Sequence, residues 1–280
     1  MLNAKKWSCL LLLQLILKTT NGQDLYYKSI SLDKNPKVTS ADKLDQSEGE
    51  IILKDSTTIE YTYEKSGDLV AYFTRYKKIK VFSDKGIEDN NKVYIPSGGV
   101  IEFMDIKART ISSANKVTSI ESSAIKDVDD VENKGSYKMF AMEGIEKNSE
   151  IEYLYTYKRA ANYFGTEYPQ SKIPRLSYGF KIISPSNLTY EAKLYNTGLT
   201  TVKTDTLSNG KNIVSVSLTN IPGLKDELYS FYKSNLIRVE YKLAYNSVRG
   251  KARLFSWDNA ADRYYHAMCI FDKKEISATN

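Results

Sequence analysis

Alternation of apolar and polar side chains with a period of two dominates this sequence, and it restricts the chain to a fold built of strands. Residues 59–64 read IEYTYE, residues 151–157 read IEYLYTY and residues 188–194 read LTYEAKL. In an extended chain, successive side chains point to opposite faces, so such a run has one apolar and one polar face. The pattern predicts strands that are half buried.

β-Branched and aromatic residues, which strands favour, fill many further stretches. Additional strands are predicted at residues 69–82, 92–95, 100–111, 116–120, 137–142, 176–183, 199–206, 212–219 and 236–245. Short turn sequences separate them, among them Asn209-Gly210, a dipeptide typical of tight hairpins. Short connections require antiparallel neighbours. The expected fold is all-β, an antiparallel β-sandwich or a pair of β-lobes, followed by a C-terminal helix.

Two helices are predicted near the end of the chain. Residues 224–233 carry apolar side chains at helical spacing. A clearer helix begins after Ser256, a typical N-cap, with Asp258 in its first turn. Its apolar stripe is expected to pack against the sandwich. The stripe consists of Trp257, Ala261, Tyr264, Met268 and Phe271. The longest irregular stretch is expected between residues 160 and 175.

The first 22 residues have the features of a secretory signal peptide. Lys5 and Lys6 precede the apolar run 10–17, and small residues allow cleavage before Gln23. This run of eight residues is too short for a membrane span. We therefore expect an exported protein, periplasmic or associated with the cell envelope. The remaining chain divides into a flexible segment (23–49), the β-sandwich domain or pair of lobes (50–247) and a C-terminal helix with a linker (248–280).

Export changes the charge and the cysteine count. The chain has 40 basic and 34 acidic residues, and three of the basic residues lie in the predicted signal peptide. The basic residues are scattered, and Lys77, Lys78 and Lys80 are interpreted as solvated strand positions. No nucleic-acid partner is expected, because such binding needs a concentrated basic face. Cys269 would be the one remaining cysteine, so no internal disulfide is expected.

Candidate chemistry is sparse. Asp262, His266 and Cys269 have the spacing of one helix face, and a thiolate beside an imidazole is the arrangement of a cysteine nucleophile. One helix supplies neither a cleft nor oxyanion donors, so we predict a structural helix and no catalytic residue.

Acidic residues also suggest no site. The run Asp127, Asp129, Asp130 and Glu132 lacks the spacing of a calcium loop and is interpreted as a solvated turn. Glu150 and Glu152 face the same way along a predicted strand and are interpreted as solvated side chains. With one histidine and two cysteines, no metal and no cofactor are expected.

Tyrosine is unusually common, with 22 residues against 9 phenylalanines. Most lie in the predicted strands, but a group in the irregular stretch 160–175 could offer ring faces and charged donors to a glycan or an extended peptide. This candidate ligand-binding group is Arg159, Tyr163, Phe164, Tyr168 and Arg175.

Residues 76–88, 105–111 and 139–153, together with 218–223 and 237–241, resemble a β-rich domain of unknown function that precedes transglutaminase-like domains in exported bacterial proteins. The resemblance implies an envelope location and an antiparallel β-fold. It transfers no catalytic residue, because the Cys, His and Asp of such proteins lie in the downstream domain. A chain ending at Asn280 would stop where that domain is expected to begin.

Two functions follow from this resemblance. The first is a non-catalytic binding or accessory module in the envelope, with a peptide, a glycan or a transglutaminase-like catalytic domain as partner. The alternative is a truncated part of a transglutaminase- or cysteine-peptidase-like enzyme whose catalytic domain is missing or lies on another chain.

Overall fold

A computed structural model describes residues 25–129, 135–198, 202–207 and 209–269. The chain divides into two units, residues 1–31 and 32–280. The described part of the first unit contains one short 3₁₀ turn, η1 (Tyr26–Ser29). The predicted signal peptide lies outside the described residues. Everything below concerns the second unit.

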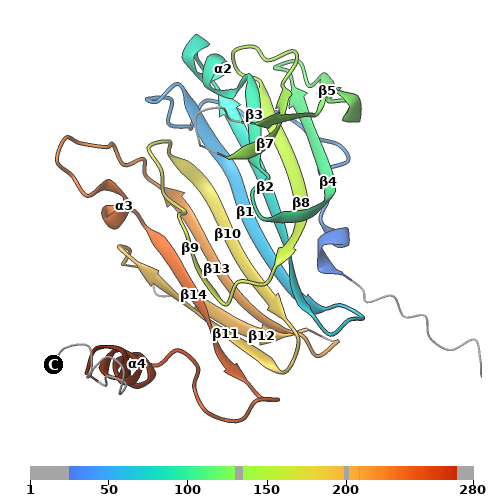
Figure 1. The fold of residues 1–280 in the computed structure, drawn as a ribbon. Coiled ribbons are helices and arrows are strands. Elements are labelled where there is room, and N and C mark those ends of the chain that lie inside the picture. Colours follow the sequence, from blue (N-terminus) through green and yellow to red (C-terminus); the bar gives the residue numbers. More distant parts are fainter. Residues whose placement is uncertain (1–24, 130–134, 199–201, 208, 270–280) are drawn as a thin grey trace, which may run out of the picture. The chain divides into compact units, whose positions relative to one another are not determined.

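Eight strands form one large sheet with the order β12-β13-β10-β1-β2-β8-β4-β5 (Figure 1). All its neighbouring strands are antiparallel except β1 and β10, which are parallel. The strands, in the order of the sheet, are β12 (Val202–Thr206), β13 (Asn212–Ile221), β10 (Arg175–Ser184), β1 (Glu50–Tyr63), β2 (Leu69–Val81), β8 (Glu150–Ala160), β4 (Val100–Ile111) and β5 (Val117–Ser119).

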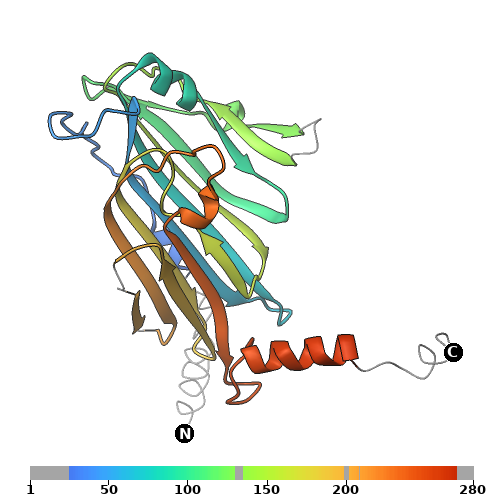
Figure 2. The ribbon, with the colours of Figure 1, turned by 90° about the vertical axis from the view of Figure 1, so that its left-hand side faces the viewer.

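Two three-stranded sheets accompany the large one. They are β11 (Leu188–Tyr195), β14 (Arg238–Asn246) and β9 (Phe164–Glu167), and β3 (Lys92–Pro96), β7 (Ser136–Ala141) and β6 (Lys126–Asp129). Both lie on the same side of the large sheet, near opposite ends of its strands (Figures 1 and 2). The predicted all-β, mainly antiparallel fold with a C-terminal helix is confirmed.

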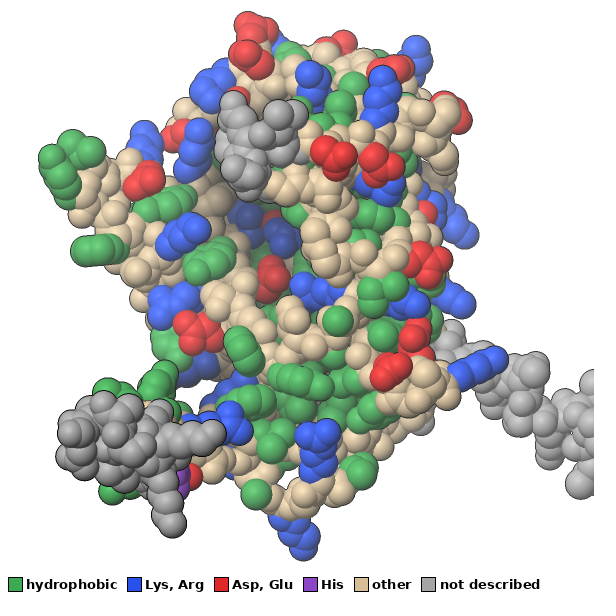
Figure 3. All heavy atoms as spheres, viewed as in Figure 1, with side chains coloured by type: hydrophobic (Ala, Val, Ile, Leu, Met, Phe, Trp, Pro, Cys, Tyr) green, Lys and Arg blue, Asp and Glu red, His purple; other side chains and the backbone are tan. Residues whose placement is uncertain are grey.

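One face of β2 contributes to two separate hydrophobic clusters. Ala71 and Phe73 pack with residues of β11 and β14, whereas Ile79 and Val81 pack with residues of β3 and β7. These four residues are an even number of positions apart, so they point to the same side of the sheet. Between the clusters the face is polar, and Figure 3 shows charged side chains of both signs in a hollow there.

The helix α2 (Asp84–Asn90) and the strands β9 and β6 were not predicted. The first turn of α2 is capped by the hydroxyl of Ser83, which accepts from Gly86 N at 3.1 Å. β9 lies in the stretch predicted to be irregular. β6 includes Asp127 and Asp129, predicted to lie in a turn, while Asp130 and Glu132 lie outside the described residues. β6 and β9 have only four residues each, too few to show a periodic pattern.

The helix predictions were half right. Residues 224–231 are not helical, and only the short α3 (Tyr232–Asn235) follows them. The C-terminal helix α4 (Trp257–Cys269) is present, and Ser256 Oγ accepts from Asn259 N at 3.2 Å as expected for an N-cap. Its expected packing against the sandwich is wrong, because none of its described side chains is buried and Trp257 is 90% exposed. The predicted stripe residue Phe271 lies outside the described residues.

The polar face of the large sheet is not solvated as the alternation predicted. Glu150 and Glu152 are buried. Glu150 accepts from the backbone N–H of Thr39 at 2.6 Å, so the segment before β1 reaches over this face. Glu152 accepts from Arg109 Nε at 2.6 Å. Burial of these carboxylates is tolerated because each meets a charged or N–H donor.

The lysines of β2 are also less exposed than predicted. Lys80 is buried, and its ammonium donates to Asn148 O at 2.9 Å. Lys78 is half-buried and lies 2.7 Å from Glu150 Oε2. Lys77 is half-buried on the opposite face, towards the hollow. Alternation therefore identified the strands correctly, but a covering segment decides which polar side chains meet water.

Among the described helices, none has the length and apolar character that crossing a membrane would require.

Candidate ligand-binding site

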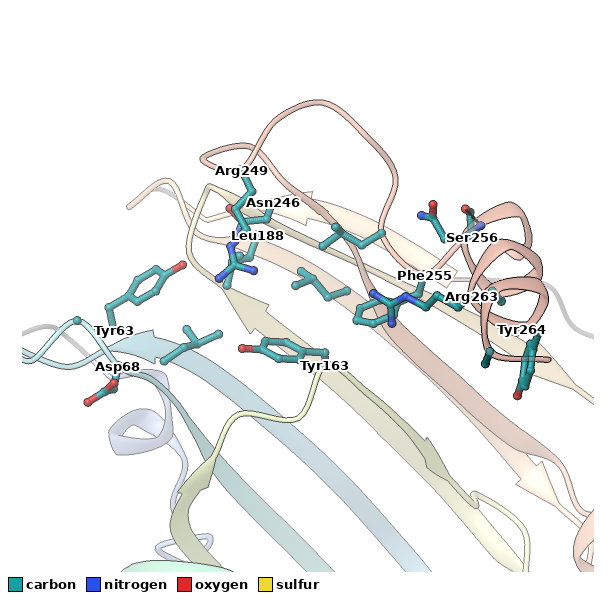
Figure 4. A pocket seen from close by; sticks show the side chains of 17 residues that line it. Tyr63, Asp68, Tyr163, Leu188, Asn246, Arg249, Phe255, Ser256, Arg263 and Tyr264 are labelled. Atoms are coloured by element: carbon teal, nitrogen blue, oxygen red, sulfur yellow. Dashed lines mark hydrogen bonds between the residues drawn. The ribbon is translucent and has the colours of Figure 1, made fainter. Parts of the chain in front are cut away.

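A groove of about 900 Å³ lies between one end of the large sheet and α4 (Figure 4). The ends of β1 and β14, the segment before β9 and one side of α4 form its walls. In Figure 4, Arg249 and Arg263 extend towards the centre of the groove, and Asp68 lies at its far end. The aromatic side chains that line it are Tyr63, Tyr163, Phe255 and Tyr264.

Hydrogen bonds fix the backbone on which Tyr163 stands. The carbonyl of Tyr163 accepts from Leu243 N at 2.6 Å. The preceding carbonyl, of Asn162, accepts from the buried hydroxyl of Tyr61 at 2.6 Å. The ring of Tyr61 stacks on Tyr190 with 4.5 Å between centroids, and burial raises the pKa of Tyr61 far above its ordinary value, so the hydroxyl stays protonated as the donor. Tyr163 is therefore presented on a rigid base.

A second cavity of about 570 Å³ lies on the outer side of the β11-β14-β9 sheet. Phe164 and Phe255 meet edge to face there, with 6.2 Å between centroids. A side chain at Gly165 would place its Cβ 2.5 Å from the hydroxyl of Tyr241, whose ring packs against Phe180 in the core. Glycine at this position thus lets β9 lie flat on the core and present Phe164 outward.

The five residues predicted to bind a ligand do not form one surface. Tyr163 lines the groove and Phe164 lines the second cavity. Tyr168 is 38% exposed and lines neither. Arg159 lies over the ring of Phe73 at 5.3 Å. Arg175 is buried, and its Nη2 lies 3.1 Å from Asp55 Oδ2.

Several groove residues were missed by the sequence analysis. Tyr63 was assigned only to a strand face, and Arg249 and Arg263 carry no local signal of a site. The exposed apolar side chains of α4 could have been a signal, because a helix stripe can face a ligand cavity as well as a core. Only the tertiary structure brings the ends of β1, β14 and α4 together.

The inner face of the large sheet carries a second group of charged residues. Asp55 Oδ2 accepts from Arg75 Nη2 at 2.6 Å and also lies beside Arg175. Arg75 Nη1 lies 3.4 Å from Glu167 Oε2, on β9. Burial raises the pKa of Glu167, against the opposing effect of Arg75. Asp55 thus joins two guanidinium groups of different strands.

Asp262, His266 and Cys269 lie on α4 in open solvent. His266 Nε2 is 3.5 Å from Asp262 Oδ1, and the two side chains are 59% and 72% exposed. Cys269 is exposed as well. The described residues build no water-excluding cleft around this thiol, which a nucleophile of this type requires. Within the described part of the chain, no group of three or more His, Cys, Asp or Glu is placed to hold a metal ion.

Replacing Asp55 with Ala should destabilise the fold by about 3 to 5 kcal/mol, because Arg75 and Arg175 would lose their shared buried carboxylate. Asp127→Ala is the control. Asp127 pairs with Lys138 but is 79% exposed, so its removal should cost less than about 1 kcal/mol. The free energy of unfolding in urea measures both, and equal costs would contradict a central role for Asp55.

Comparison with solved structures identifies relatives of this fold. A protein of Parabacteroides distasonis, crystallised as a candidate protease, matches with a TM-score of 0.56 and 15% identity. The match covers 70% of this chain and 40% of that protein. This chain therefore corresponds to less than half of its neighbour, and identity at this level shows a shared fold only.

Other matches are weaker. An M1 zinc metallopeptidase of Deinococcus radiodurans matches with a TM-score of 0.37 and 8% identity, over 69% of this chain and 42% of that one. A candidate nutrient-binding protein of Legionella pneumophila also has a TM-score of 0.37 and 8% identity, over 82% and 77% of the two chains. These scores are too low to support an inference about function. No curated protein sequence matches the chain.

The sequence model of one family, DUF3857, described as a domain of unknown function with a solved structure, matches residues 68–225. This match includes β2 to β13 and therefore most of the large sheet. The chain belongs to the DUF3857 family.

Proposed function

We propose that this protein is a non-catalytic binding module of the cell envelope, and that the groove beside α4 holds an extended peptide. The observation that carries the proposal is the set of exposed rings in that groove: Tyr63 and Tyr163 are 37% and 44% exposed, and Phe255 and Tyr264 are 47% and 70% exposed. Groups of aromatic side chains that stay exposed to solvent in a monomer are typical of binding surfaces.

Size and charge support a peptide as the ligand. A volume of about 900 Å³ is in the upper part of the range for ligand sites. Arg249 and Arg263 supply two cations against the one carboxylate of Asp68, which favours a peptide bearing an acidic side chain. The aromatic rings would contact its apolar side chains at low entropic cost.

Replacing Tyr163 with Ala should weaken peptide binding about tenfold, because it removes a groove ring whose backbone is fixed by hydrogen bonds. The probe is a tryptic digest of casein. Its binding is measured by calorimetry and by the fluorescence of Trp257, which lines the second cavity and follows the groove residue Ser256. N-acetylglucosamine hexasaccharide is the glycan probe.

Two tyrosines serve as controls. Tyr94 is 53% exposed on β3, and Tyr168 follows β9 without lining the groove. Tyr94→Ala and Tyr168→Ala should bind as the wild type does. Wild-type affinity in Tyr163→Ala would refute the groove as the peptide site. If the protein bound the hexasaccharide and not the peptides, the ligand would be assigned as a glycan.

Envelope location is part of the proposal and rests on the features of residues 1–22. Expression of the whole chain in a bacterium should release a periplasmic protein whose first residue is Gln23. N-terminal sequencing of the periplasmic fraction measures this. A cytoplasmic protein that retains Lys5 and Lys6 would contradict it.

A second candidate function is favoured by the fold neighbour in Parabacteroides distasonis, of which this chain matches 40%. In this alternative the chain is part of a transglutaminase- or cysteine-peptidase-like enzyme and assists a separate catalytic domain. Such a domain, expressed separately, should bind this chain and change its turnover of an acyl substrate. If the purified chain alone turned over that substrate and Cys269→Ser abolished the activity, both accessory roles would be excluded.

A further inference from the structure

Polar and aromatic side chains form two rows across the strands in the middle of the large sheet, on its inner face. Strand register places Asp55 beside Tyr178 of β10 and Lys77 of β2, and Lys77 beside Tyr153 of β8. In the next row, Arg75 of β2 lies beside Tyr155 of β8. Residues opposite each other in a sheet point to the same face, so these side chains form one surface.

This surface lies between the two hydrophobic clusters, where neither small sheet closes over it completely. Figure 3 shows a hollow at this place, with blue and red side chains at its floor. Arg75 keeps 20% of its side chain exposed and Glu167 keeps 17%. Arg75 and Glu167 therefore remain in contact with solvent, whereas Asp55, Arg175 and Tyr178 of the same group are buried.

Cations outnumber acids in the hollow. Arg75 and Arg175 share Asp55, and Arg75 also approaches Glu167. Lys77 has no salt bridge or hydrogen bond to any described residue. Arg75, Lys77 and Arg175 are three cations against the two carboxylates of Asp55 and Glu167, which leaves one positive charge in excess within this group of five. Burial and the two neighbouring arginines lower the pKa of Lys77, against the attraction of Asp55 and of Glu50 outside the group.

Four buried polar atoms in the same cluster lack hydrogen-bond partners among the described residues. They are Asp55 Oδ1, Arg175 Nε, Arg175 Nη1 and the hydroxyl oxygen of Tyr178. Asp55 is 0% exposed, Arg175 is 4% exposed and Tyr178 is 1% exposed. Folded proteins leave few such atoms unsatisfied, because each costs about 1 to 3 kcal/mol. Arg175 Nε, Arg175 Nη1 and the hydroxyl of Tyr178 are three unused donors near the ammonium of Lys77. An oxyanion could accept hydrogen bonds from all of them.

We propose that Arg75, Lys77 and Arg175, with the hydroxyl of Tyr178, form a binding site for one oxyanion group, the carboxylate or the phosphate of a small ligand. Lys77 supplies the charge that the carboxylates leave unbalanced, and the guanidinium of Arg175 supplies directional N–H donors. Asp55 holds the two arginines in place through its Oδ2. The site shares no residue with the groove beside α4, so it does not depend on the proposed peptide binding.

The test uses the whole chain and two probes, sodium phosphate and sodium acetate, each compared with sodium chloride at equal ionic strength. An anion that binds only the folded protein raises the melting temperature, by about 4 °C at ten times its Kd. The expected result is a rise with at least one probe. A rise with phosphate only assigns a phosphate ligand, and a rise with acetate only assigns a carboxylate.

Lys77→Met removes the unpaired cation while keeping a long unbranched side chain, and it should abolish most of the rise. Lys92→Met, at an exposed position of β3, is the matched control and should respond as the wild type does. Because Lys77→Met can shift the melting temperature by itself, each variant is compared with its own value in chloride.

A second readout does not depend on stability. Acetylation of Lys77 by acetic anhydride, followed by peptide mass spectrometry, should slow severalfold in the presence of the anion that raises the melting temperature, whereas acetylation of Lys92 should not. The proposal is overturned if neither anion affects the melting temperature or Lys77 acetylation, or if Lys77→Met responds as strongly as the wild type.

Discussion

Pairing of buried charges between neighbouring strands is the interaction on which this structure depends. The large sheet buries polar side chains on both faces, and a charge taken out of water is tolerated only when an opposite charge and hydrogen bonds replace the water. On one face Glu152 meets Arg109, and on the other Asp55 meets Arg75 and Arg175. These pairs fix the register of β8 with β4, and of β1 with β2 and β10, because a shift by one residue would send a partner to the opposite face.

That register also positions both candidate sites. The groove lies at the end of the strands, where Tyr63 closes β1, and the oxyanion site lies at their middle. Hydrophobic clusters on either side of the middle support the two small sheets, which leave the polar centre uncovered. A rigid sheet therefore serves as the base for both candidate sites, whereas the exposed α4 lines the groove and contributes no residue to the proposed oxyanion site.

Much of the fold could be predicted from the sequence, because a period of two in residues 59–64 or 151–157 depends on local geometry alone. Burial could not be predicted in the same way. Lys80 and Glu150 have the alternation of solvated residues, yet both are buried. Lys80 donates to the backbone carbonyl of Asn148, whereas Glu150 is covered by a distant segment and is paired with Lys78 of the neighbouring strand. Tyr163 could be proposed as a binding residue from its setting, but the groove that it lines needs Arg249 and Arg263, which no local pattern links to it.

The parallel pairing of β1 with β10 has a consequence for how the chain reaches this structure. Ile52 of β1 is aligned with Arg175 of β10. Along the sequence, these two strands are separated by most of the region that matches the family model. During synthesis β1 can pair with β2 early, through a short hairpin, but its other edge remains open until β10 has left the ribosome. An open edge in the centre of a future sheet invites pairing with other chains. The charged side chains of Lys54 and Asp55 on β1 oppose such pairing. Asp55 therefore stabilises the folded sheet and also disfavours association with other chains before folding is complete.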